Sequence, residues 1–114
     1  MGYRSEACLV LDGESKIILQ KLCEVSEIVK SLVDCVDDSA GWDDISADND
    51  CKLSWSHIKW NCYNIDIRHI EDFIECLPGE SFHFLRIGED NEDIEERGFY
   101  TDSGIYIHRS IQGW

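Results

Sequence analysis

The pattern of apolar and polar positions predicts a chain in which strands and helices alternate. Residues 7–11 are an apolar run closed by Asp12 and Gly13, which is typical of a strand that ends in a turn. Residues 16–36 follow with apolar side chains at steps of four and three, the spacing of one helix face. These apolar positions are Ile18, Leu22, Val25, Val29, Leu32 and Val36. We expect one long helix here, capped by Asp12 or Ser15 and packed on a sheet.

The middle of the chain predicts a loop and then a bent strand. Residues 37–50 are polar and carry no apolar period, so they predict a loop. Residues 51–56 alternate between apolar and polar side chains, and residues 58–60 alternate with the opposite parity. A β-bulge, which inserts one extra residue into a strand, accounts for such a switch. We therefore expect a bulge near Ser56 and His57.

The second half predicts one more helix and two more strands. Asp66 can cap a helix over residues 67–77, and Pro78 ends it because proline disfavours a helical residue before it. Residues 81–87 predict a strand, and residues 105–111 alternate as a last strand. The order is then β-α-β-α-β-β. It predicts an α+β fold in which two helices pack on one face of a four-stranded antiparallel or mixed sheet.

Composition bounds the size and the setting of this fold. A chain of 114 residues that is 43% hydrophobic can fill one core, so residues 1–114 are expected to form a single domain. Trp55, Trp60 and Tyr106 are expected partly on the sheet face away from the helices. No apolar run reaches the roughly 18 residues of a membrane span, and the start lacks the pattern of a signal peptide. We therefore expect a cytoplasmic protein.

The net charge of −14 is concentrated in two segments. Residues 34–50 hold seven acidic residues and no basic one, and residues 89–96 hold six acidic residues and no basic one. The two segments therefore supply 13 of the 14 net charges. Such a chain lacks the basic footprint that binding to nucleic acid or to an anionic membrane requires. It favours a basic partner, such as a protein that itself holds DNA or RNA.

Three explanations of this charge stay open. The ordinary one is a solvated acidic surface without a specific partner. The second is mimicry of nucleic acid: residues 89–96, if extended, span about 26 Å and carry about one charge per 4 Å, near the ~3.4 Å per phosphate of one strand. The third is a Ca²⁺ site, but residues 44–51 and 89–96 both lack the glycine that a Ca²⁺-binding loop has at its sixth position.

The residues typical of catalysis and metal binding do not fall at informative spacings. The six cysteines, at positions 8, 23, 35, 51, 62 and 76, share no zinc-site spacing. We interpret them as reduced thiols that pack as small apolar side chains. A nucleophilic pair of Cys62 with His57 stays open, because such pairs are neighbours in space and not in sequence. We expect no enzyme, no cofactor and no metal ion.

Arginine and tryptophan side chains flank or interrupt the two acidic segments. Arg86 lies just before residues 89–96 and Arg97 just after them, so we expect both to pair with neighbouring carboxylates and to order this segment. Trp42 lies inside the predicted loop over residues 37–50. It is either an anchor that packs on the core or an aromatic contact residue at an interface.

Four short stretches carry a resemblance to a known family. They are Met1-Gly2-Tyr3-Arg4-Ser5 (MGYRS), Lys59-Trp60, Arg86 to Asp90 (RIGED), and the closing strand from Gly104 to Ile111. In them the chain resembles a family of short acidic proteins from bacteriophages and prophages, whereas residues 37–50 depart from it. The family has no established activity, so the resemblance implies no catalytic residue. By analogy with other small acidic phage proteins, it implies inhibition of a host defence.

These observations together predict a small phage-type protein of the bacterial host cytoplasm, a DNA or RNA mimic that inhibits a restriction or CRISPR-like protein by occupying its basic nucleic-acid groove. The partner-binding residues would be Glu89, Asp90, Glu92, Asp93, Glu95, Glu96, Asp43, Asp44, Asp48, Asp50 and Trp42. The alternative is an interaction module without mimicry, or a homodimer. Binding that weakens steeply with salt would favour the first.

Overall fold

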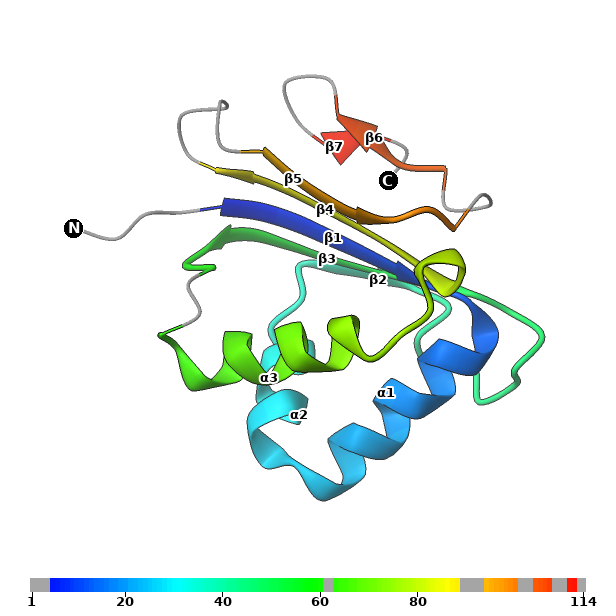
Figure 1. Ribbon diagram of the computed structural model, residues 1–114. Coiled ribbons are helices and arrows are strands. Elements are labelled where there is room, and N and C mark those ends of the chain that lie inside the picture. Colours follow the sequence, from blue (N-terminus) through cyan, green and yellow to red (C-terminus); the bar gives the residue numbers. More distant parts are fainter. Residues whose placement is uncertain (1–4, 61–62, 89–93, 101–103, 108–110, 113–114) are drawn as a thin grey trace.

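The computed structural model describes residues 5–60, 63–88, 94–100, 104–107 and 111–112. In this part of the chain three α-helices pack on one face of an antiparallel sheet, which makes the fold α+β (Figure 1). The helices are α1 (Gly13–Val25), α2 (Glu27–Asp34) and α3 (Ile65–Glu75), with a short 3₁₀ helix η1 (Gly79–Ser81). The strands are β1 (Ser5–Leu11), β2 (Asp38–Ala40), β3 (Cys51–Ile58), β4 (Phe82–Gly88), β5 (Ile94–Gly98), β6 (Tyr106–Ile107) and β7 (Ile111–Gln112).

Strand β1 is the centre of the sheet. The order of strands is β2-β3-β1-β4-β5, and every pairing is antiparallel. Leu9 pairs with Leu53 on one side and with Phe84 on the other. Both faces of β1 are covered, so residues 7–11 are fully buried. This explains why the strand is a continuous apolar run in place of an alternating one.

The expected four-stranded sheet with two helices is wrong in detail. The described residues form a five-stranded sheet, because β2 adds a short strand inside the expected loop and β5 begins within the second acidic segment. The expected last strand, residues 105–111, is instead a separate pair of strands, β6 and β7. Figure 1 shows this pair above the sheet face that the helices leave open. Ile105 closes a second small core there with Cys8, Val10, Leu85 and Ile87.

The expected long helix is divided at Ser26 into α1 and α2. The N–H of Ser26 donates to the carbonyl oxygen of Leu22 and so ends α1, while its hydroxyl accepts from the N–H of Val29 and so starts α2. The predicted apolar stripe is therefore only partly buried. Ile18 is 52% exposed and Val25 83% exposed, because α1 turns a different side toward the sheet.

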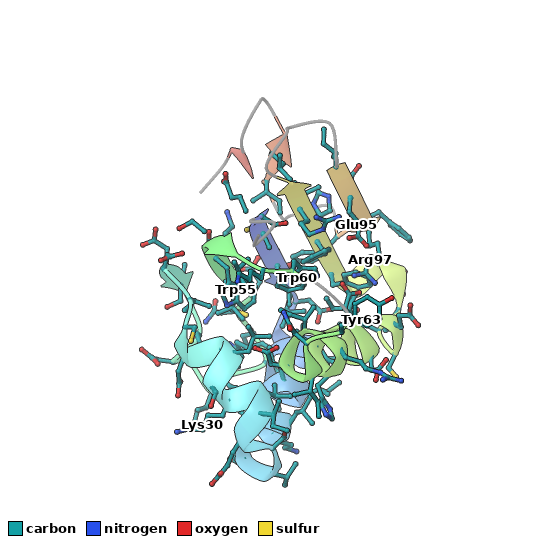
Figure 2. All side chains as sticks on the ribbon, turned by 90° about the vertical axis from the view of Figure 1, so that its left-hand side faces the viewer. Lys30, Trp55, Trp60, Tyr63, Glu95 and Arg97 are labelled. Atoms are coloured by element: carbon teal, nitrogen blue, oxygen red, sulfur yellow. The ribbon has the colours of Figure 1, made fainter. Side chains whose placement is uncertain are left out.

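The bulge in β3 is confirmed. Ala7 pairs with Trp55 and Ser5 pairs with Ile58, so three steps along β3 match two steps along β1. Trp55 and Trp60 do not lie on the face away from the helices. Both belong to the core between the sheet and the helices, where Figure 2 shows them side by side. These two aromatic side chains therefore fill the larger core, between the sheet and the helices.

The ends of the helices follow local signals with one shift. Asp12 caps α1, as expected, by accepting a hydrogen bond of 2.8 Å from the N–H of Ser15. Helix α3 begins earlier than expected, at Ile65 after the cap residue Asn64, and Asp66 lies inside its first turn. A negative charge in the first turn still suits the positive end of the helix dipole. The helix ends before Pro78, as expected.

Candidate partner-binding surface

The acidic loop, residues 41–50, joins β2 to β3 and is fastened to α1 by a buried lysine. The side chain of Lys16 is fully buried, and its Nζ donates to the carbonyl oxygens of Ser46 at 2.7 Å and of Asn49 at 2.9 Å. A buried ammonium group is costly unless it is hydrogen-bonded, so these two carbonyls are essential partners for it. The loop and the helix therefore hold each other in place.

One helical turn further along, Gln20 makes the second attachment. Its amide nitrogen donates to the carbonyl oxygens of Trp42 at 2.7 Å and of Asp44 at 3.2 Å. Trp42 is half-buried and packs against the main core, which supports its interpretation as an anchor. The loop also touches the start of α1 directly: a Cβ atom on Gly13 would lie 1.9 Å from the carbonyl oxygen of Ala47. Only glycine fits at this contact.

Within the loop, Asp44 organises the backbone. Its carboxylate accepts from the N–H of Ser46 at 2.8 Å and from the side-chain amide of Asn49 at 2.6 Å. These hydrogen bonds, with a smaller contribution from the nearby charge of Lys16, lower the pKa of Asp44. Asp44 is thus used to shape the loop, and it keeps its negative charge there.

The remaining loop carboxylates are oriented outward to different degrees. Asp43 and Asp48 are exposed, while Asp50 is half-buried and accepts a hydrogen bond of 3.3 Å from the hydroxyl of Tyr100. Between them Ile45 is 84% exposed. Within the described residues no Lys or Arg forms an ion pair with these three carboxylates. The loop therefore presents negative charge around one apolar side chain.

The second acidic segment is described only at its end. Four of its predicted partner-binding residues lie outside the described residues: Glu89, Asp90, Glu92 and Asp93. Glu95, on β5, accepts a hydrogen bond of 3.1 Å from Nε of Arg86, and its other oxygen lies 3.1 Å from Nε of Arg97. The expected pairing of both arginines with a flanking carboxylate is confirmed. Glu95 is therefore engaged inside the chain.

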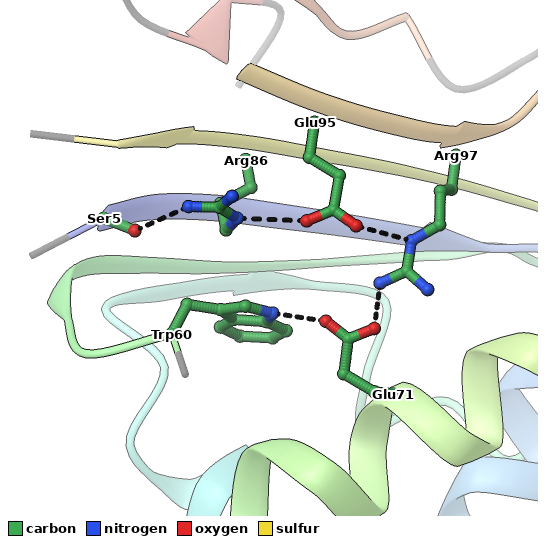
Figure 3. A network of polar contacts seen from close by, with 6 residues as sticks. All are labelled: Ser5, Trp60, Glu71, Arg86, Glu95 and Arg97. Atoms are coloured by element: carbon green, nitrogen blue, oxygen red, sulfur yellow. Dashed lines mark hydrogen bonds and ion pairs between the residues drawn. The ribbon is translucent and has the colours of Figure 1, made fainter. Parts of the chain in front are cut away.

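This pairing extends into a network that ties β5 to α3 (Figure 3). The guanidinium group of Arg97 donates to Glu71 of α3, and Glu71 accepts a second hydrogen bond of 2.7 Å from the indole of Trp60. The guanidinium carbon of Arg97 also lies 5.1 Å from the centre of the Phe84 ring, a cation–π distance. Glu95 and Arg97 thus serve the packing of the sheet edge on the helix.

Glu96 is the next residue of β5, so its side chain leaves the sheet on the face opposite to that of Glu95. Its carboxylate is 2.7 Å from Nε2 of His83, and its side chain is 61% exposed. Glu96 therefore keeps an accessible side that a partner can reach, unlike Glu95.

The acidic loop precedes β3 at one end of the sheet, and the second acidic segment follows β4 at the other end. Cys51, which follows the acidic loop, pairs with Leu11 at the end of β1. Gly88, which precedes the second acidic segment, pairs with Ser5 at the beginning of β1, and Ile94 pairs with Ile87 at the same end. The described carboxylates therefore do not gather into one continuous patch.

Two of the described cysteines, Cys8 and Cys51, are buried. Burial raises the pKa of Cys8 and of Cys51 to about 12, which keeps both thiols protonated. The predicted pair of Cys62 with His57 lies outside the described part of the chain, which includes neither Cys62 nor the side chain of His57. Among the residues that are described, no three His, Cys, Asp or Glu side chains converge as metal ligands.

Sequence reasoning missed the residues that give the site its shape. Lys16 and Gln20 are ordinary polar positions of a predicted helix, and Glu71 and Trp60 are distant from the acidic segments in the sequence. The position of Lys16 in the helix pattern was a local signal that this lysine is buried. Lys16 lies three positions before Leu19, on the side of α1 that turns inward. A lysine at such a position needs acceptors, and the loop backbone supplies them.

Comparisons of the chain with known proteins found no similar protein. The chain matches no protein family, no curated protein and no solved structure. The helices in the described part are too short or too polar to serve as membrane spans. The interpretation of the surface therefore depends on its own charge and geometry.

Proposed function

We propose that this protein is a small acidic inhibitor that occupies the basic nucleic-acid groove of a host defence protein, of the restriction or CRISPR-like kind, as a mimic of DNA or RNA. The observation that carries the proposal is the fixed acidic loop. Lys16 and Gln20 hold its backbone, and Asp43 and Asp48 remain exposed. The partner is a protein, in the bacterial host cytoplasm, and not nucleic acid itself.

Rigidity is what distinguishes this loop from an ordinary solvated charge run. A flexible acidic segment loses conformational entropy when it binds, whereas a loop already fixed by hydrogen bonds loses little. Carboxylates held in a fixed arrangement can face Lys and Arg side chains that normally meet phosphates. The negative charge of the loop also speeds encounter with a basic groove.

The hydrogen bonds and ion pairs of the described residues support a division of the predicted contact residues into three groups. The acidic loop becomes the main contact, with Asp43 and Asp48 as its outward charges and Asp44 as its support. Glu95 is assigned to the internal network with Arg86 and Arg97. The residues that stay as a proposed second contact are Glu96 on β5 and four residues outside the described part of the chain, Glu89, Asp90, Glu92 and Asp93.

The test compares two double variants with the same change of charge. Asp43→Asn/Asp48→Asn removes two charges from the acidic loop, and Glu14→Gln/Glu24→Gln removes two exposed charges from α1. Bacteria that carry a defined restriction or CRISPR-type system are infected with phage while they express each form. We expect wild type and the α1 variant to protect the phage and the loop variant to lose this protection.

Purified components then test the mode of binding. Once the defence complex that responds has been identified, the protein should compete with DNA or RNA for it, and its affinity should fall steeply as salt rises. Equal protection by both variants, or binding that nucleic acid does not displace, would overturn the proposal.

A second candidate is an interaction module without mimicry, or a homodimer, which the exposed apolar side chains of α1 favour. Ile18 and Val25 lie seven positions apart, which places them two turns from each other on the same side of α1, and both are largely exposed. Contact through them would be insensitive to salt. Sedimentation of wild type and Val25→Ser across protein concentrations separates the two candidates.

A further inference from the structure

Strand β2 is an open edge of the sheet. Its three residues, Asp38 to Ala40, pair with β3 on one side, and all three are exposed. No other strand of the described part pairs with β2 on its outer side. An edge strand presents a row of backbone N–H and C=O groups that can pair with another extended chain.

Next to β2, Asp37 already pairs with the backbone of β3. The unpaired edge of the sheet is therefore limited to β2 on this side. The N–H of Asp37 donates to the carbonyl oxygen of Ser54 at 2.8 Å and so continues the pairing with β3. Its carboxylate accepts from both the N–H and the hydroxyl of Ser56. The N–H of Ser56, the donor of β3 beyond the end of β2, is therefore already hydrogen-bonded. An added strand would have to pair with β2.

The opposite edge of the sheet is built differently. On β5, Glu95, Glu96 and Arg97 are all engaged with other residues of the chain. Such charged and paired side chains are a usual protection of an edge strand. Strand β2 carries one charged residue, Asp38, so fewer charged side chains protect its edge.

The charge around β2 selects the kind of chain that would add to it. From Asp34 to Asp50 the sequence contains seven acidic residues and no basic one. The basic residue opposite Ala40 on β3 is Lys52, whose ammonium group lies near Gly104. In an antiparallel pairing of two copies centred on this short strand, Asp38 of each copy would meet the acidic surroundings of the other, which like-charge repulsion disfavours.

We infer that the outer edge of β2 accepts an extended, Lys- and Arg-rich segment of a partner protein as an added strand. The backbone of β2 supplies the hydrogen bonds, and Asp38 and Asp43 supply the attraction for basic side chains. The inference rests on the proposed function only for the basic character of the partner. In this inference the partner segment contacts the protein through backbone hydrogen bonds to β2, beside the acidic loop.

The probe is a short synthetic peptide of alternating Lys and Val, compared with the same peptide N-methylated at alternate residues. N-methylation removes backbone donors and keeps the charge, so it separates strand pairing from plain attraction. Hydrogen exchange measured by NMR should slow at backbone amides of residues 38–40 with the first peptide and not with the second.

Charge variants provide the matched control. Asp38→Lys should weaken binding of the unmethylated peptide roughly tenfold or more, whereas Glu24→Lys, the same change on an exposed part of α1, should leave it within about twofold. Equal binding of the two peptides, protection at β5 in place of β2, or self-association of the free protein through β2 would overturn the inference. Failure here with retained loss of phage protection by Asp43→Asn/Asp48→Asn would leave the proposed function standing.

Discussion

The ammonium group of Lys16 lies 2.7 Å from the carbonyl oxygen of Ser46, a residue 30 positions further along the chain. This contact joins the first helix to the acidic loop and places a positive charge beneath it. The ammonium group donates to backbone carbonyl oxygens, while the carboxylates of Asp43 and Asp48 are exposed to solvent. The protein thereby combines a fixed loop with an acidic surface.

Replacement of Lys16 by methionine should loosen the loop. Lys16→Met keeps most of the side-chain volume but leaves the carbonyl oxygens of Ser46 and Asn49 without their donor, so we expect a loss of about 1–3 kcal/mol in the free energy of unfolding. Equilibrium unfolding in urea measures this loss. Lys21→Met, at an exposed position of the same helix, should change stability by less than about 0.5 kcal/mol. Equal effects of the two variants would mean that the buried contact does not hold the loop.

The carboxyl group of Asp44 should titrate at a lower pH in the folded protein than in the unfolded chain. Hydrogen bonds from Ser46 and Asn49 lower its pKa from the ordinary value of 3.8, so it stabilises the fold above that value, and this stabilisation is lost as the pH falls through the lowered pKa. NMR titration of the aspartate side chains measures the shift directly. Asn49→Ala should raise the pKa of Asp44, whereas Asn64→Ala, at the remote start of α3, should leave the Asp44 titration unchanged. Identical titrations in the two variants would remove the role assigned to the Asn49 amide.

Glu71 and Arg97 should be energetically coupled. Each side chain is mostly buried, and Arg97 also lies over Phe84, so a double-mutant cycle with Glu71→Gln and Arg97→Met should give a coupling free energy of about 1–2 kcal/mol. Arg97→Lys should not restore the stability, because a lysine ammonium cannot reproduce the planar contact with the ring and the carboxylate. Additive effects of the two single substitutions would contradict this coupling.

Four of the described thiols should fall into two classes of reactivity. Cys35 and Cys76 are exposed, whereas Cys8 and Cys51 are buried with pKa values raised to about 12. Brief treatment of the folded protein with iodoacetamide near pH 8 should alkylate the first two and spare the second two. Peptide mass spectrometry gives the extent at each position, and the protein unfolded in urea is the control. Rapid alkylation of Cys51 in the folded state would show that the loop before it opens often.

Local signals in the sequence were sufficient for the parts of the fold that depend on neighbouring residues. The strand over residues 7–11, the Asp12 cap and the bulge near Ser56 each follow from side chains within a few positions of one another. The division of the long helix at Ser26 was missed because the apolar spacing continues across it, and serine is also tolerated inside a helix.

The candidate site was harder to predict because its geometry comes from distant contacts. Lys16 and Ser46, or Glu71 and Arg97, meet only after the sheet has brought separate segments together. The concentration of carboxylates was visible in the sequence, but their division between Glu95, engaged internally, and Asp43, exposed, was not. A count of charged residues predicts the sign of the surface charge. It does not predict which of the charged side chains a partner can reach.

The central place of β1 has a consequence for how the chain folds during synthesis. Leu9 needs Leu53 on one side and Phe84 on the other, so β1 receives its last neighbour only when β4, more than 70 residues further along the chain, has left the ribosome. At about 5–20 residues per second, the apolar segment 7–11 remains uncovered for several seconds. Any product that stops before residue 82 leaves that segment exposed, and will be recognised by chaperones and proteases as unfinished.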